Sequence, residues 1–102
     1  MIKSQIKIHE ILTSILGSKN AYFQPPSSVR MKYPAIRYSL KKIDKRYADN
    51  LPYCKRDCYE VIYIDTNPDS DVLDKISNLP MCEYDRHYVS DNLNHYVFTL
   101  FI

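Results

Sequence analysis

The apolar residues near the start of the chain recur with the spacing of one helix face. They follow one another at intervals of three, one, three and one residues: Ile8, Ile11, Leu12, Ile15 and Leu16. Because residues three and four apart lie on the same side of a helix, this pattern predicts an amphipathic helix over residues 3–16. Gly17 follows directly, at the position where helices commonly end in the left-handed conformation. We therefore expect the helix to end at residue 16.

Two later stretches alternate apolar and polar positions, as a strand with one buried face does. The apolar positions are Ile36, Tyr38 and Leu40 in the first, and Tyr59, Val61 and Tyr63 in the second. Residues 41–56 between them are the most charged stretch of the chain, with a turn predicted at Asp49-Asn50-Leu51-Pro52. We expect the two strands to continue as a long basic hairpin that projects beyond the core.

The second half of the chain predicts a short helix and a final pair of strands. Asn67 and Pro68 are the residue types preferred at the cap and first position of a helix, so a helix is expected over residues 68–78, ended by Pro80. Alternation over residues 82–89 and 95–102, on either side of the polar turn Ser90-Asp91-Asn92, predicts two antiparallel strands. An extended connector is expected at residues 22–28, which contain two prolines. The order predicts a single α+β domain over residues 1–102, with an antiparallel sheet of four to five strands.

The composition excludes several classes of protein function. The chain has 102 residues and one glycine, and neither a P-loop nor a dinucleotide-binding loop can be built with one glycine. No segment approaches the ~20 apolar residues of a membrane span, and the start of the chain lacks the pattern of a secretory signal. Three cysteines without a framework pattern fit reduced thiols in a cytoplasm. The ten tyrosines suit half-buried sheets and subunit interfaces.

Residues able to bind metal or perform catalysis are present, but their spacing is unfavourable. The zinc-type side chains are Cys54, Cys58, Cys82, His87 and His95. On one strand, Cys54 and Cys58 would lie about 13 Å apart at ~3.3 Å per residue, whereas two sulfurs on one zinc lie within roughly 4 Å. The run Asp85-Arg86-His87 contains residue types found in catalytic sites. Any chain with three histidines would contain such residues too, so the run does not indicate catalysis. We predict no catalytic residue, no metal, no cofactor and no small-molecule substrate.

Charge is distributed unequally along the chain. Residues 1–60 carry twelve Lys/Arg and five Asp/Glu, net +7, and residues 61–102 carry two and seven, net −5, which together give the overall +2. If the fold keeps these halves apart, the positive face of one copy can meet the negative face of the next in a head-to-tail ring or stack. The alternative is that both are solvated faces of a monomer.

The predicted hairpin and the end of the chain supply the candidate interface residues. They are Lys41, Lys42, Lys45, Arg46, Lys55, Arg56, Tyr47, Tyr53, Phe101 and Ile102. The basic and aromatic hairpin residues are open to three interpretations: a solvated tip, contact with nucleic-acid phosphates and bases, or docking on the acidic surface of a neighbouring copy. The last strand is apolar on both faces, and we expect a partner to cover the surplus.

Several patches together carry a family resemblance over nearly the whole chain. They are residues 21–38, which contain Phe23-Gln24-Pro25-Pro26, residues 64–71, Leu79-Pro80, Asp85-Arg86-His87-Tyr88, and Asp91-Asn92-Leu93-Asn94-His95. As a set they resemble small structural proteins of tailed bacteriophages, described as tail terminator, tail-completion or head–tail joining proteins. Thr66-Asn67-Pro68 stands where the family has a more acidic run, which leaves the helix cap intact because Asn caps as well as Asp does.

The resemblance implies a virion protein without enzymatic activity, assembled in the cytoplasm of the bacterial host. It implies an α+β subunit that forms a ring, usually a hexamer, at the head-proximal end of the tail tube, where it stops tube polymerisation and docks to the head or neck. The implied partners are further copies of the chain, the tail tube protein and connector or neck proteins, with DNA passing through the lumen. The alternatives are a head-completion or neck connector protein, or a small nucleic-acid-binding module that uses the hairpin 41–56.

Overall fold

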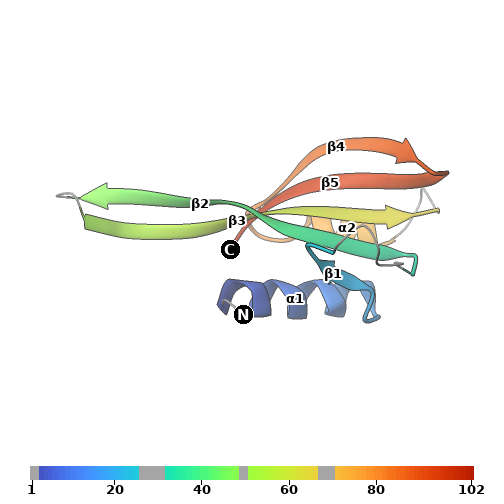
Figure 1. Cartoon of the computed structure of the whole chain (residues 1–102), viewed down its shortest axis with the longest axis horizontal. Helices are drawn as coiled ribbons and strands as arrows, with labels where there is room; N and C mark the ends of the chain where they lie inside the picture. The colour runs from blue at the N-terminus through green and yellow to red at the C-terminus, as the bar shows by residue number, and fades with distance from the viewer. Residues whose placement is uncertain (1–2, 26–31, 49–50, 67–70) are drawn as a thin grey trace.

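The computed structural model describes residues 3–25, 32–48, 51–66 and 71–102; for residues 3–4, 44–48 and 51–56 it describes the backbone. The elements are α1 (Lys3–Leu16), β1 (Ala21–Phe23), β2 (Ala35–Ala48), β3 (Leu51–Asp65), α2 (Asp71–Ser77), β4 (Cys82–Ser90) and β5 (Leu93–Phe101) (Figure 1). The five strands form one sheet in the order β1-β2-β3-β5-β4. The predicted α+β fold is confirmed, and so are the bounds of the first helix.

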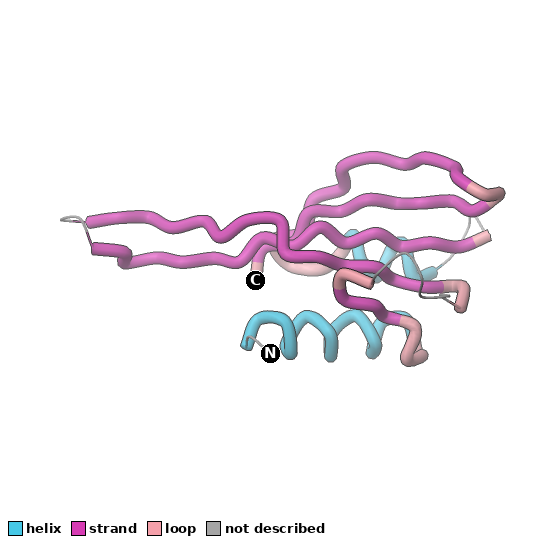
Figure 2. The backbone as a smooth tube through the Cα atoms, in the orientation of Figure 1, coloured by secondary structure: helices cyan, strands magenta, loops and turns pink. Residues whose placement is uncertain are grey.

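The β2–β3 hairpin is much longer than the rest of the sheet. Its pairing runs from Ala35↔Ile64 to Ala48↔Leu51, whereas β5 follows β3 only to Cys58↔Phe101. Past that point the hairpin continues as a two-stranded ribbon that leaves the body of the molecule (Figure 2). We call residues 41–56 the arm. The predicted hairpin is therefore confirmed; of the predicted turn, Leu51 and Pro52 pair with β2, and residues 49–50 lie outside the described residues.

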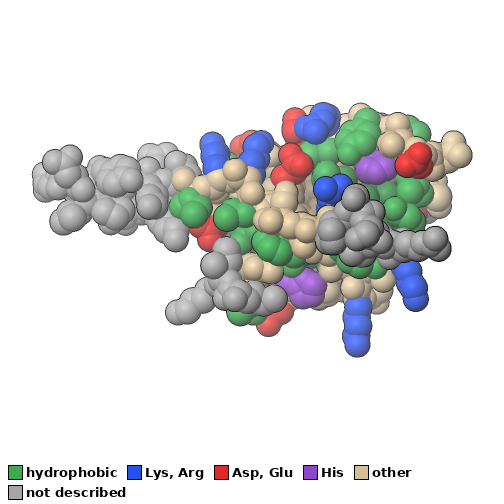
Figure 3. All heavy atoms as spheres, viewed as in Figure 1, with side chains coloured by type: hydrophobic (Ala, Val, Ile, Leu, Met, Phe, Trp, Pro, Cys, Tyr) green, Lys and Arg blue, Asp and Glu red, His purple; other side chains and the backbone are tan. Residues whose placement is uncertain are grey.

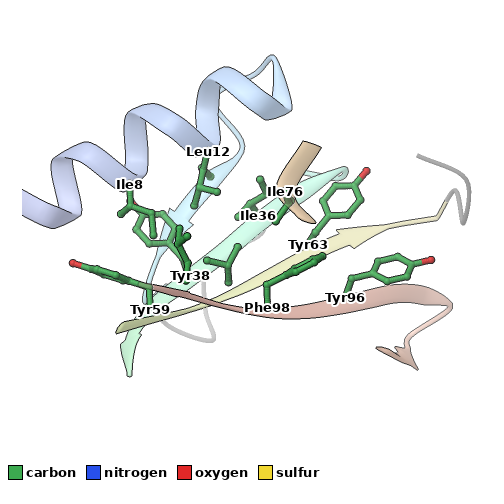
Figure 4. Packing of buried hydrophobic residues seen from close by; sticks show 12 residues of the cluster. Ile8, Leu12, Ile36, Tyr38, Tyr59, Tyr63, Ile76, Tyr96 and Phe98 are labelled. Carbon is green, nitrogen blue, oxygen red and sulfur yellow. The ribbon is translucent and has the colours of Figure 1, made fainter. Parts of the chain in front are cut away.

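Both helices pack on one face of the sheet and cover an aromatic core (Figure 4). The register aligns Ile36, Tyr63 and Tyr96 in one row across β2, β3 and β5, and Tyr38, Val61 and Phe98 in the next. Ile8 and Leu12 of α1 and Ile76 of α2 lie over these rows and are fully buried. Four tyrosines, Tyr38, Tyr59, Tyr63 and Tyr96, are thus core residues and take no part in any exposed surface.

Two of these buried phenols have hydrogen-bond partners inside the fold. His9 Nδ1 lies 2.7 Å from the hydroxyl of Tyr38, and Tyr63 donates a hydrogen bond to Asp65 Oδ2 at 2.5 Å. Burial, with a smaller contribution from Tyr59, raises the pKa of Tyr38 to about 12. The polar tips of the tyrosines are therefore accommodated in the core by local partners, as buried polar groups require.

The sheet is mixed, which corrects the prediction of an antiparallel one. The expected connector at residues 22–28 begins with strand β1, which pairs in parallel with residues 36–38 of β2. Ile36 N donates to Asn20 O and Gln24 N donates to Tyr38 O, each at 2.9 Å. Gln24 has a φ of 42°, which is outside the strand region, and Leu40 N donates to its side-chain Oε1 at 3.3 Å, so β1 ends after three residues.

The second helix forms where expected within the described residues, whereas the fourth strand differs from expectation. α2 spans Asp71–Ser77, with Asp71 and Asp74 in its first turn, and the predicted cap Asn67-Pro68 lies outside the described residues. In β4 a bulge between Tyr84 and Arg86 shifts the phase, so the simple alternation predicted over residues 82–89 is wrong. One extra residue on one strand moves every later side chain to the opposite face. None of the described helices has the length and apolar character needed to cross a membrane.

Candidate functional site

The arm carries eight of the ten candidate interface residues. Its strands pair through Asp44↔Arg56, Lys45↔Lys55 and Arg46↔Cys54, which places the backbone of the four basic residues in the ribbon. The side chains of six candidates lie outside the described residues: Lys45, Arg46, Tyr47, Tyr53, Lys55 and Arg56. At the root of the arm the side chains of Lys41 and Lys42 are exposed. The structure therefore puts two cations where the arm leaves the body.

The chain terminus lies beside the root of the arm. Asp57 N donates to Ile102 O at 3.2 Å, and Ile102 N donates to Asp57 O at 2.9 Å. This reciprocal pair places Phe101 and Ile102, both half-buried, at the point where β5 stops pairing with β3 and the two-stranded arm begins. The two remaining candidate residues are thus brought next to the arm by the tertiary structure.

The surplus of apolar side chains on the last strand is smaller than predicted. Val97 is fully buried within the chain although it lies on the face opposite the helices. β5 is flanked by β3 and β4, and Val97 pairs with Ile62 on one side and Arg86 on the other. Among the apolar residues 96–102, Phe101 and Ile102 are half-buried and the others are buried, so the surplus that a partner could cover lies at these two residues.

An apolar groove of about 310 Å³ opens next to these terminal residues. It is lined by Lys7 and Ile11 of α1, by Leu79, Pro80 and Met81 of the turn after α2, and by Leu100, Phe101 and Ile102. Phe101 N donates to Met81 O at 3.0 Å, which ties the turn to the end of the sheet. Lys7 is the one charged residue among the eight, so the groove can hold an apolar side chain and offers no set of groups for catalysis. Sequence reasoning missed it because its walls come from three separate segments.

The far edge of the sheet is an exposed strand. In β4 every residue from Glu83 to Ser90 is exposed, and the side chains of Tyr84 and Val89 are 56% and 63% exposed. The opposite edge is β1, which has only three residues. Long edge strands are sites where another chain can pair, and natural proteins commonly blunt them with Lys or Pro, neither of which occurs in β4. The lack of both residue types is the sequence signal that could have revealed this surface.

Stacked rings fix β4 to β5 on both faces. His87 stacks on Tyr96 and Tyr88 stacks on His95, each with ring centres 4.7 Å apart, and His87 Nε2 lies 3.0 Å from Asn94 Oδ1. The two histidines therefore lie on opposite faces of the sheet and serve packing. Across the described residues no group of three or more His, Cys, Asp or Glu side chains is placed to hold a metal ion.

The cysteine side chains that the structure describes are buried or half-buried. Cys58 is fully buried and Cys82 half-buried, while the Cys54 side chain lies outside the described residues. Burial, together with the nearby Glu83 carboxylate, raises the pKa of Cys82 to about 11. A thiol with that pKa is protonated at neutral pH and is a poor nucleophile.

The strand order separates the arm from the edge strand β4. β1, β2 and β3 come from residues up to 65 and stand at one end of the strand order, whereas β5 and β4 come from residues 82–101 and stand at the other. The two helices contact each other, so Asp71 and Asp74 of α2 lie on the same face of the sheet as α1. The acidic residues at the end of the strand order away from the arm are therefore Glu83, Asp85 and Asp91, in β4 and the turn after it.

No protein-family model matches the sequence, and no curated protein is significantly similar to it. The likeness to phage tail proteins therefore stays a prediction. The arm, the groove and the edge strand are the surfaces of the described residues that bear on function.

Proposed function

We propose that this chain is a virion structural subunit of tailed bacteriophages, a tail terminator whose copies form a ring that caps the tail tube and joins it to the head or neck. The observation that carries the proposal is the arm, a two-stranded ribbon continuing past the last residue of β5. A ribbon of two strands is marginally stable by itself in water and gains stability by lying on another surface.

The shape of the molecule supports a role in assembly. Its extents are 50 × 27 × 23 Å, and the arm accounts for the long axis (Figure 1). An arm that projects from the body lets one subunit contact parts of a neighbouring subunit that lie beyond the face on which the two bodies meet. The space-filling view shows lysine and arginine side chains exposed along the body next to the arm (Figure 3).

The two kinds of contact surface on the body favour a ring over a symmetric pair. The basic arm lies on one side of the sheet and the acidic edge on the other, so an arm reaching a neighbour's edge makes a head-to-tail contact. Head-to-tail contacts close into rings when the rotation between copies divides a full turn. Opposite charges at the two surfaces set the orientation of each contact and speed its formation.

The proposal is tested by the oligomeric state of the purified chain, alone and with the tail tube protein of the same phage, measured by native mass spectrometry and light scattering. We expect one closed ring of fixed stoichiometry. The double variant Lys41→Glu, Lys42→Glu should weaken the ring by removing the exposed cations at the root of the arm. The matched control is Lys19→Glu, Lys32→Glu, which reverses two exposed cations away from the arm and should leave the ring unchanged.

A chain that stays monomeric at high concentration with and without tube protein would overturn the ring. A head-completion or neck role is separated from a terminator role by binding, since the former predicts a complex with connector protein and none with the tube. The nucleic-acid alternative predicts that the monomer binds duplex DNA with an affinity that falls steeply with salt, and that the Lys41, Lys42 variant reduces the slope by about 2.

A further inference from the structure

We infer that the outer edge of β4 is the acceptor for the arm of a neighbouring copy, which adds to it as a further strand and continues the sheet from one subunit into the next. This inference rests on the proposed ring and names the surface by which it closes. It assigns the contact to main-chain hydrogen bonds along one strand edge. The side chains then set the orientation and the choice of partner.

The turn between β4 and β5 determines which backbone groups face outward. Asp91 and Asn92 both have positive φ, 53° and 62°, which is the geometry of a two-residue type I′ turn. In such a hairpin the flanking pair, here Ser90↔Leu93, exchanges both hydrogen bonds, and every second pair beyond it does the same. Tyr88 therefore directs its backbone groups toward β5.

By the same alternation, the N–H and C=O groups of His87 and Val89 point away from β5. β4 is the last strand in the sheet order, so no described strand pairs with these groups. They form a row of donors and acceptors open to an added strand. The bulge after Tyr84 interrupts the row, so the regular acceptor segment is Arg86–Ser90.

The arm has the length to serve as the added strand. Its β2 side supplies residues 41–48, about 26 Å at ~3.3 Å per residue, and the acceptor segment needs about 17 Å. The outer edge of β2 has no described strand along these residues, because β1 pairs only as far as Tyr38. The arm and β4 lie at opposite sides of the sheet with β5 between them (Figure 2), so an arm reaches a β4 edge only on another copy.

Charge selects the arm over other strands. Residues 41–56 carry six Lys/Arg and two Asp/Glu, net +4, whereas residues 82–91 carry one and three, net −2. The acceptor segment itself holds Arg86 and no carboxylate, and Arg86 pairs with the half-exposed Asp85 at 2.7 Å. The attraction to a basic arm therefore comes from Glu83 and Asp91, which flank the segment on either side. Pairing one arm with another would place basic residues against basic residues. Pairing through β1 would offer an edge of only three residues.

The backbone basis of this contact is tested by Val89→Pro against Val89→Ala. Proline removes the outward N–H without breaking a bond to β5, and alanine keeps the N–H while trimming a side chain that is 63% exposed. We expect Val89→Pro to raise the concentration at which half of the chain is in rings by tenfold or more, and Val89→Ala to change it less than threefold. Circular dichroism on thermal unfolding checks that both variants fold.

A second measurement uses the unaltered chain and so does not depend on how the variants fold. Rings assembled from equal parts of ¹⁴N- and ¹⁵N-labelled chain are treated with a zero-length carbodiimide, and mass spectrometry identifies lysine–carboxylate links between the two isotopes. Links from the arm lysines to Glu83 or Asp91 are expected. Rings whose intermolecular links avoid β4, or a folded Val89→Pro chain that assembles as the unaltered chain does, would overturn this inference and leave the ring intact. A chain that forms no ring overturns both proposals.

Discussion

The hydroxyl of Tyr38 provides a direct test of how the aromatic core is held. Tyr38 is 1% exposed, lies between the rings of Phe23 and Tyr59, and has His9 as its hydrogen-bond partner. Its pKa of about 12 in the folded chain compares with 10.0 for a free tyrosine. Because the folded pKa is the higher one, the stability from the protonated phenol is fully present below pH 10 and is lost as the pH rises toward 12.

The size of this loss follows from the pKa shift. One pKa unit is worth about 1 kcal/mol, so the whole shift corresponds to a loss of a few kcal/mol, part of which has appeared by pH 11. Tyr38→Phe removes the titrating group. The difference in free energy of unfolding between the unaltered chain and Tyr38→Phe should therefore shift by about 1 kcal/mol in favour of the variant between pH 9 and pH 11.

The measurement is urea unfolding followed by circular dichroism at several pH values over this range, in the presence of a reductant. Tyr33→Phe is the control, since it makes the same substitution at a side chain that is 44% exposed and lies outside the core. If the Tyr38→Phe difference stays constant with pH, the phenol ionises in the folded chain as it does in water. The placement of Tyr38 under α1 would then be wrong.

Two further predictions concern backbone conformation at the ends of elements. Gly17 has a φ of +74°, and no atom lies within 4 Å of the position that a Cβ would take. Gly17→Ala should therefore lower the free energy of unfolding by about 1 kcal/mol through backbone strain alone. A neutral result would show that α1 does not end in this conformation. Asn92 occupies the second position of the β4–β5 turn with a φ of 62°. Asn92→Gly should therefore raise the free energy of unfolding by up to ~1 kcal/mol, and Asn92→Val should lower it by about 1–2 kcal/mol. Urea unfolding measures both changes. Equal stability of these two variants would rule out the type I′ turn.

The elements predicted well are those whose signal is local. The apolar spacing of α1 and the position of Gly17 after it depend only on residues within a few turns of each other, and the structure ends α1 at Leu16. The alternation at residues 36–40 and 59–63 predicted two strands of one hairpin, because period-two patterning and intervening polar residues are properties of a continuous segment. The two strands at the end of the chain followed from the same reasoning.

The features missed are those that depend on which segments become neighbours. β1 is a strand because β2 lies beside it, and its three residues have no alternation to detect. The bulge near Asp85 adjusts β4 to β5, and nothing in residues 82–90 alone marks it. The groove by Phe101 needs three segments to form, and Val97 lies on a strand that has a neighbour on each side, which depends on the strand order.

The sequence by itself determined the helical and extended segments, the unequal division of charge and the lack of a glycine-rich ligand loop, because each of these is a property of residue order and composition. Only the tertiary structure decided that the basic hairpin projects as an arm, that four tyrosines are buried, and that the acidic half ends in an open strand edge. The physical reason is that burial and backbone pairing are set by strand order, which joins residues far apart in the chain. The net charge of +2 therefore conceals two separate surfaces, an arm and an edge, that a second copy can bring together.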